Sequence, residues 1–366
     1  MSASATVARD LHFLILVEGH FGPLTSKTAN SCIRYTPERV SAVLDSRRAG
    51  KTSQQVLGFG GAIPVVATVA AGVAQRPAPN ALLIGVAPTG GRLPAEWRTM
   101  VLEAIHHRLD IWSGLHTFIG DDPEFAARAR AKGVEIHDLR KSPKDLPIAS
   151  GRVRNTDATV VLSIGTDCNI GKMTAVLQVR DALRARGPRV RFVGTGQTGI
   201  LIEGWGTAVD AVVADFIAGA AERLVLEAAA DADIILVEGQ GSIIHPGYSG
   251  VTMGLIHGAL PNAMIMCHQP SRKHIGNNTW IPIPPLPKFI ALHEAIVAPL
   301  RPAPVIAVSL NTYDLSLCAA KAVIARTAKQ TGLPTTDPVR FDAGPVADAI
   351  DRFHRRRVKR APKTKR

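Results

Sequence analysis

The ten residues GTDCNIGKMT at 165–174 have the types and spacing needed to bind a phosphate chain. Gly165 and Gly171 permit tight backbone turns, so successive N–H groups can converge on an anion at the positive end of a following helix. Lys172 adds a mobile cation where phosphates would lie. The alternative interpretation is a plain strand-to-helix turn with a solvated lysine. We favour phosphate binding because the flanking elements have the required order.

Those flanking elements are a buried strand and an amphipathic helix. Residues 160–164 are apolar and rich in β-branched side chains, which is typical of a parallel strand covered on both faces. After the loop, Val176, Val179 and Leu183 recur at helical spacing. The predicted cofactor-binding residues of the loop are Gly165, Thr166, Asp167, Cys168, Asn169, Ile170, Gly171, Lys172, Met173 and Thr174.

The loop departs from the usual phosphate-binding pattern at one informative position. That pattern places Ser or Thr directly after the lysine, where its hydroxyl ligates the magnesium of ATP or GTP. This chain has Met173 there, and Thr174 lies about 100° further around the helix. We therefore expect the loop to hold no metal ion. We expect it to bind a molecule with a pyrophosphate group that is not cleaved, such as coenzyme A. An NTPase with altered metal ligation is the alternative.

Candidate catalytic residues follow another predicted strand, at 234–237. Glu238 ends that strand and occupies the place of the second nucleotide-binding signature, where a carboxylate acts as a base or holds a metal-bound water. His245 follows in a glycine- and proline-containing loop, and histidine titrates near neutral pH. The predicted catalytic residues are Glu238, His245 and Lys172, with an exposed, uninvolved histidine as the alternative for His245.

Three further segments supply candidate binding residues. The glycine-rich stretch at 194–206 is predicted to be a loop that approaches the ligand, with Gln197 as a polar cofactor contact. A basic cluster at 268–274 is suited to carboxylates or outer phosphate oxygens, and a solvated loop is its alternative. The predicted substrate-binding residues there are Arg272, Lys273 and His274. Asn311, at the end of a strand at 305–310, is expected to contact an adenine edge.

The remaining chain reads as two α/β domains. Strands and helices alternate between residues 11 and 150, which predicts a parallel, Rossmann-like sheet, although no G-x-G-x-x-G follows the first strand. We predict a Rossmann-like domain at 1–145, a phosphate-loop domain at 146–350 and a basic, disordered tail at 351–366. The proline-rich segment 281–289 is expected to be neither a helix nor an interior strand.

Composition restricts the class of protein. The 366 residues carry a net charge of +13, but residues 352–366 alone hold nine Lys or Arg and no acidic residue, so nucleic-acid contact is expected at most from the tail. The four cysteines are too scattered for a disulfide framework or a metal knuckle. The N-terminus has only a short apolar patch, so we expect no signal peptide or membrane span. The scattered cysteines indicate a reduced, cytoplasmic setting. We also expect a homo-oligomer.

The motifs carry two family resemblances. GTDCNIGKMT, GTGQTG and VEGQGS resemble short motifs of dethiobiotin synthetase. Over residues 25–340 the chain resembles the DgcN-like family, long catalogued as a domain of unknown function, through KTANSCIRY, LLIGVAPTGGRLPAEWR, SGLHTFIGDDPEF and VEGQGSIIHPGYSG. This second resemblance implies an N-acetyltransferase that takes acetyl-CoA and a D-amino acid, notably D-glutamate.

Three hypotheses therefore come from the sequence. The first is acetyl transfer from acetyl-CoA to an amino-acid substrate, with residues 165–174 holding the CoA phosphates. The second is an ATP- and magnesium-dependent activating ligase of the dethiobiotin synthetase type, which requires ADP formation. The third is a non-enzymatic nucleotide-binding protein whose tail contacts RNA or an acidic partner.

Overall fold

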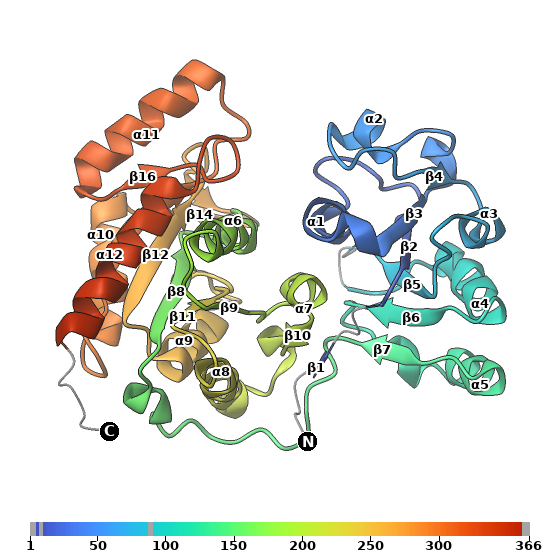
Figure 1. Cartoon of the computed structure of the whole chain (residues 1–366), viewed down its shortest axis with the longest axis horizontal. Helices are drawn as coiled ribbons and strands as arrows, with labels where there is room; N and C mark the ends of the chain where they lie inside the picture. The colour runs from blue at the N-terminus through green and yellow to red at the C-terminus, as the bar shows by residue number, and fades with distance from the viewer. Residues whose placement is uncertain (1–4, 7–9, 87–90, 361–366) are drawn as a thin grey trace. The chain divides into compact units, whose positions relative to one another are not determined.

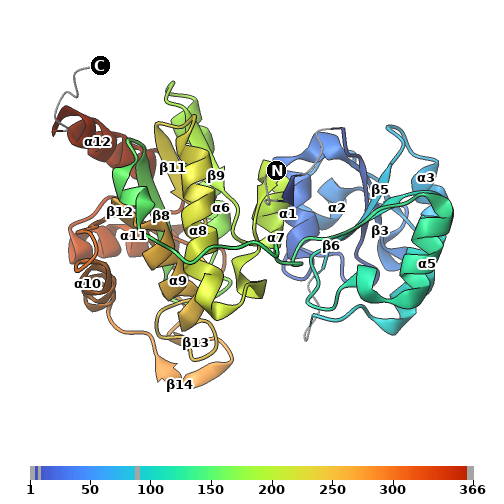
Figure 2. The ribbon, with the colours of Figure 1, turned by 90° about the horizontal axis from the view of Figure 1, so that it is seen from below.

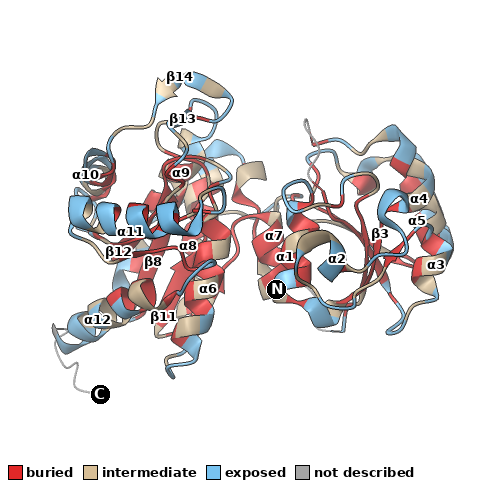
Figure 3. Cartoon of the chain, turned by 90° about the horizontal axis from the view of Figure 1, so that it is seen from above, coloured by how far each residue is buried: buried red, intermediate tan, exposed pale blue. Residues whose placement is uncertain are grey.

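The computed structural model describes residues 5–6, 10–86 and 91–360, and it divides the chain into two compact units. The first unit contains the residues up to Pro143 together with Gln197–Ala211, and the second contains Lys144–Gly196 and the residues from Val212 onward. In each unit, buried strands lie between helices whose outer faces are exposed (Figure 3). None of the described helices is long and apolar enough to span a bilayer.

The first unit is built on a six-stranded parallel sheet, which confirms the Rossmann-like prediction. The strand order β4-β3-β2-β5-β6-β7 places the first and fourth strands of the sheet, β2 and β5, at its centre, as in dinucleotide-binding folds. Its strands are β2 (Phe13–Leu16), β3 (Val40–Leu44), β4 (Val65–Val66), β5 (Ala81–Ile84), β6 (Asp110–Ser113) and β7 (Ile136–Asp138). Its helices are α1 (Lys27–Tyr35), α2 (Ser53–Leu57), α3 (Val69–Val73), α4 (Arg98–His106) and α5 (Pro123–Lys132).

The second unit carries a parallel sheet in the order β16-β15-β12-β8-β11-β9, so the strand before the phosphate loop lies near the sheet centre (Figure 1). All seven residues of β8 are buried, because helices cover the sheet. The strands are β8 (Thr159–Gly165), β9 (Val190–Val193), β11 (Ile234–Val237), β12 (Ala263–His268), β15 (Val305–Leu310) and β16 (Thr335–Thr336). The helices are α6 (Lys172–Arg184), α8 (Ala214–Ala229), α9 (Ser249–Ala259), α10 (Leu286–Val297), α11 (Leu317–Thr331) and α12 (Gly344–Arg360).

The glycine-rich stretch after β9 is not the loop that we predicted. It contains helix α7 (Gln197–Glu203), which packs against α1, and strand β10 (Trp205–Gly206), which pairs with β1 (Ala5–Thr6). Ile200 and Leu201 are buried in the core of the first unit. The predicted domain division at residue 145 therefore misses a segment, because the apolar face of α7 completes the first core.

Two further segments also differ from their predictions. Residues 351–360 are not a disordered tail but the second half of α12, which is anchored in the core by the buried Val346 and Ile350; residues 361–366 lie outside the described part of the chain. The proline-rich segment contributes an edge strand and a helix start. Strand β14 (Asn278–Pro282) pairs with β13 (His274–Ile275) in a hairpin that stands apart from the main sheet (Figure 2), and α10 begins at Leu286, where prolines in the first turn are tolerated.

A buried carboxylate fastens the start of the second unit to its core. Glu222 on α8 is only 1% exposed and accepts hydrogen bonds from the backbone N–H groups of Ser150 and Gly151, from the Ser150 hydroxyl and from the Arg152 guanidinium. Burial alone would raise the pKa of Glu222, but the bonds from Arg152 and Ser150 outweigh it and lower that pKa. The ionised form is therefore the one that holds this segment.

We predict that Glu222→Ala lowers the free energy of unfolding by about 2–3 kcal/mol at pH 7, because several donors lose their acceptor. The pKa of Glu222 is lower in the folded protein than in the unfolded chain. Its contribution to the free energy of unfolding is therefore fully present above pH 4.5, the ordinary pKa of a glutamate, and is lost as the pH falls through the folded-state pKa. Urea unfolding at several pH values measures both effects. Asp215→Asn, on an exposed turn of the same helix, should cost less than about 1 kcal/mol; an equal cost for the two variants would contradict the assignment.

Candidate functional site

The phosphate loop lies between β8 and α6 with two left-handed residues in its backbone. Asn169 has φ +53° and Gly171 has φ +97°, and Gly171 is the residue from which α6 begins. This conformation needs glycine at 171, because a Cβ there would also lie 3.4 Å from Nδ2 of Asn311. The predicted contact residue Asn311 is thus placed beside the loop.

The Lys172 ammonium is held inside the loop. Its Nζ donates to the carbonyl oxygens of Asp167, at 2.7 Å, and of Gly241, at 2.8 Å, and the residue is buried. The same loop is joined to the next strand connection by the Ser242 hydroxyl, which donates to the Thr166 carbonyl oxygen. The lysine therefore lies at the junction of the loop and the segment after β11.

Asp167 organises the outer side of the loop. Its Oδ2 accepts from Arg272 Nη1 at 2.7 Å and from the Gly276 N–H at 2.8 Å, while Oδ1 accepts from the Cys168 N–H. Arg272 Nη1 also donates to the Cys168 carbonyl oxygen at 2.7 Å. Arg272, which we predicted to be a substrate ligand, is thus engaged by the loop itself.

The other predicted cations have different surroundings. Lys273 and His274 are both exposed, and Lys273 Nζ donates to the Pro270 carbonyl oxygen. His268, counted in the same basic cluster, has its pKa lowered to about 4 by burial and by the nearby Lys273 and Arg272. It is neutral at neutral pH, and its Nδ1 lies 3.0 Å from the Thr166 hydroxyl. The cluster is consequently less positive than its sequence indicates.

Two residues of the predicted binding loop are packing residues. Ile170 is buried in a small apolar cluster with Ala175 and Cys267, and Met173 is 6% exposed. Only their backbone groups are in a position to serve an anion. Met173 therefore replaces the usual metal-binding hydroxyl with a buried apolar side chain, and Thr174 is half-buried one position further on.

Glu238 is buried at the end of β11, next to β8. Its Oε2 accepts from the backbone N–H groups of Thr195, at 3.0 Å, and Gly196, at 3.1 Å, and its carbonyl oxygen accepts from the Thr195 hydroxyl. Two backbone donors on one oxygen stabilise the carboxylate. Glu238 therefore joins the ends of β9 and β11 at the carboxyl edge of the sheet.

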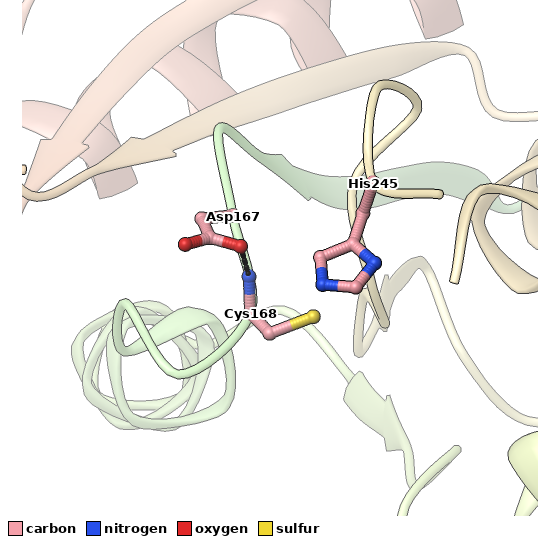
Figure 4. Close-up of side chains that lie close together, drawn as sticks. All are labelled: Asp167, Cys168 and His245. Carbon is pink, nitrogen blue, oxygen red and sulfur yellow. Dashed lines mark hydrogen bonds between the residues drawn. The ribbon is translucent and has the colours of Figure 1, made fainter. Parts of the chain in front are cut away.

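His245 and Cys168 lie on opposite sides of the same small space (Figure 4). One ligand atom each from Asp167, Cys168 and His245 lies within 4.8 Å of the other two. The Nδ1 atom of His245 accepts from the Gly247 N–H at 3.0 Å, so the neutral ring carries its proton on Nε2. The nitrogen that Figure 4 shows turned toward the Cys168 sulfur is this Nε2.

The three residues are poorly suited to a metal ion. Both oxygens of Asp167 already accept hydrogen bonds, and one of them is paired with the Arg272 cation. Binding a divalent cation there would remove the acceptor of Arg272 and bring two positive charges together. We therefore interpret Asp167 as a structural residue of the loop, with Cys168 and His245 facing each other beside it.

Gln197 begins α7 and belongs to the first unit. Its side-chain oxygen accepts from Arg140 Nη2 at 2.8 Å, and Arg140 is also paired with Asp210. Sequence reasoning missed Gly241, Ser242 and Gly276, whose backbone or hydroxyl groups hold the loop. The available signal was the EGQGS motif, whose small residues allow two loops to approach closely.

Comparison with known proteins identifies relatives that match most of the chain. Residues 147–347 match the P-loop domain of DUF1611, and residues 46–142 match its N-terminal Rossmann-like domain, both described as domains of unknown function. A protein from Tritonibacter scottomollicae named D-glutamate N-acetyltransferase is 41% identical over 74% of this chain and 80% of its own length. A protein of the same name from a Pseudoalteromonas species is 34% identical over 70% and 77%.

A solved structure is similar over nearly the full length. The crystal structure of a DUF1611 family protein from Anabaena variabilis superposes with a TM-score of 0.88 at 38% identity. It covers 94% of this chain and 100% of the other. The likeness therefore includes both α/β units and not the phosphate-loop domain alone.

We predict that Asp167 and Arg272 are energetically coupled. Asp167→Ala and Arg272→Ala should each lower the free energy of unfolding by about 3 kcal/mol, because each leaves a partly or fully buried charge without its partner. The double variant should cost less than the sum, with a coupling energy above about 1 kcal/mol in denaturant titrations. Additive effects would mean that Arg272 acts independently of the loop.

Proposed function

This chain belongs to the DUF1611 family, and from that membership we propose that it is an N-acetyltransferase that acts on D-glutamate with acetyl-CoA as the acetyl donor. Two relatives named D-glutamate N-acetyltransferase, each matching more than two thirds of this chain, support the reaction and the acceptor. The donor is inferred from the chemistry of the phosphate loop.

The loop at 165–174 is proposed to hold the phosphates of CoA. The observation that carries this proposal is the combination of Lys172, buried among the loop carbonyls, with the apolar Met173 at the position of the magnesium-binding hydroxyl. Backbone N–H groups at the start of α6 and a lysine are suited to a pyrophosphate. Acetyl transfer breaks a thioester rather than a phosphoanhydride, so this reaction has no need of a metal on the phosphates.

Glu238 and His245 are proposed to share the acid–base work. Attack requires the acceptor's neutral amine, and the Glu238 side chain, which lies at the end of β11, is the proposed proton acceptor. His245 presents Nε2–H because Nδ1 accepts from Gly247. We assign it as a donor to the oxyanion that forms on the thioester carbonyl, and not as the base.

The acceptor's carboxylates are proposed to meet the exposed cations of the 268–274 segment. Lys273 and His274 are exposed there, while Arg272 fixes the position of the segment through Asp167. This division assigns Lys273 and His274 to the substrate and Arg272 to the loop.

We predict that acetyl-CoA raises the melting temperature and that ATP with magnesium does not. At 100 times its dissociation constant a ligand adds about 2.7 kcal/mol, which is several degrees for a protein of this size. Lys172→Ala should abolish the shift, whereas Lys288→Ala, at an exposed position on α10, should preserve it. A shift with ATP and magnesium alone would favour the activating-ligase hypothesis.

For the base, we predict that Glu238→Gln lowers kcat by about 10²-fold or more while acetyl-CoA binding is retained. His245→Gln should be milder, because the amide still offers an N–H donor. Initial rates of free CoA release with D-glutamate measure both effects. Full activity in Glu238→Gln would reject the proposed base.

A further inference from the structure

We propose that a pocket in the first unit binds an organic phosphomonoester, which is a small molecule that carries a terminal phosphate group. The pocket has a volume of about 620 Å³ and is lined by residues of the segments 19–25 and 45–48. This volume is in the range of small-molecule sites in proteins. The proposal does not depend on the acetyltransferase assignment, because none of these residues belongs to the loop at 165–174.

The pocket lies where an open α/β sheet binds its ligands. Segment 19–25 follows β2, segment 45–48 follows β3, and these two parallel strands are neighbours in the sheet. Ligands of such sheets bind outside the carboxyl ends of the strands. In dinucleotide-binding folds, an acidic residue after the second strand binds the ribose, or an arginine nearby accommodates a phosphate on that ribose. The position of the pocket is therefore one at which this architecture recognises small molecules.

Two carboxylates hold the walls of the pocket together. Asp45 is 1% exposed, and it accepts from the Phe21 N–H through Oδ2, at 2.9 Å, and from the Arg47 N–H through Oδ1, at 3.0 Å. Glu18 accepts from the backbone N–H and from the hydroxyl of Ser46. Each carboxylate thus joins the segment after β2 to the segment after β3. Because both Asp45 oxygens already accept backbone donors, Asp45 is poorly suited to bind a ribose.

Arg47 and Arg48 provide the pocket with two guanidinium groups. Both residues are exposed, and no hydrogen bond or ion pair of either side chain is recorded among the residues that the structure describes. The Arg47 guanidinium lies against the backbone of Gly19, where a Cβ would be 3.4 Å from its Cζ. A phosphomonoester carries about two negative charges at neutral pH and three acceptor oxygens. It therefore matches two guanidinium forks in charge and in geometry.

Apolar side chains line the same pocket. Phe21 is buried, whereas Pro23 is exposed and Leu24 is 74% exposed. His20 also lines it, and its ring meets Trp97 edge to face with the centroids 5.9 Å apart. Small-molecule sites combine apolar walls with a few polar groups that fix the orientation of the ligand. This combination favours an organic phosphate over inorganic phosphate.

The test measures AMP binding to the full-length protein by isothermal titration calorimetry at low salt. Adenosine, which lacks the phosphate, is the matched ligand control and should bind at least about tenfold more weakly than AMP. Arg47→Ala/Arg48→Ala should weaken AMP binding by a similar factor, because the charged donors are lost. Arg128→Ala/Arg130→Ala removes the same charge from exposed positions on α5 and should leave AMP binding unchanged.

The same titrations in a Lys172→Ala background separate the pocket from the loop at 165–174. AMP should still bind this variant, and adding Arg47→Ala/Arg48→Ala should still weaken the binding. Ribose 5-phosphate carries the phosphomonoester without the base. Equal affinity for ribose 5-phosphate and AMP would identify a sugar phosphate as the ligand class, whereas tighter binding of AMP would identify a nucleotide.

Three outcomes would overturn the proposal. The first is that neither AMP nor ribose 5-phosphate binds the Lys172→Ala protein. The second is an equal loss of AMP affinity in the two double arginine variants, which would reduce the effect to general attraction by net charge. The third is that inorganic phosphate binds as tightly as AMP. The rate of acetyl transfer to D-glutamate enters none of these outcomes, so the pocket and the acetyltransferase assignment are tested independently.

Discussion

The carboxylate of Asp167 is the interaction on which the rest of the site depends. It accepts hydrogen bonds from Cys168 within the loop and from Arg272 and Gly276 in the segment after β12. A buried carboxylate is costly unless its oxygens are occupied, and here the occupants come from two distant parts of the chain. The loop and the basic segment must therefore adopt their positions together. The same pairing keeps the Arg272 cation next to Cys168.

The site has a consistent division of charge. Lys172 and the N-terminus of α6 supply positive potential inside the loop, whereas Glu238 supplies a carboxylate at the neighbouring strand end. The two histidines of the site have different surroundings. His268 is desolvated beside cations, and His245 has its Nδ1 occupied by a backbone donor. A neutral donor near an anionic reaction centre stabilises developing charge without consuming a proton.

The sequence predicted the strand ends well and the loop functions less well. The bounds of β11 and β15 agree with their predicted ranges, because buried parallel strands are short apolar runs with sharp polar ends. Helix α7 was missed because its glycines suggest a loop, and only packing against α1 reveals its apolar face. The role of Arg272 was misassigned because a basic cluster in sequence does not disclose a buried acidic partner 105 residues away. The tautomer of His245 depends on one backbone N–H and has no sequence signal.

The central claim is that the loop holds the phosphates of the acetyl donor without a metal. The most direct test compares kcat/KM for acetyl-CoA and for acetyl-pantetheine, which carries the same thioester without phosphates, in the wild-type protein and in Lys172→Ala. The account predicts a strong wild-type preference for acetyl-CoA that largely disappears in Lys172→Ala and is insensitive to a magnesium chelator. Equal use of the two donors by the wild-type protein would contradict it.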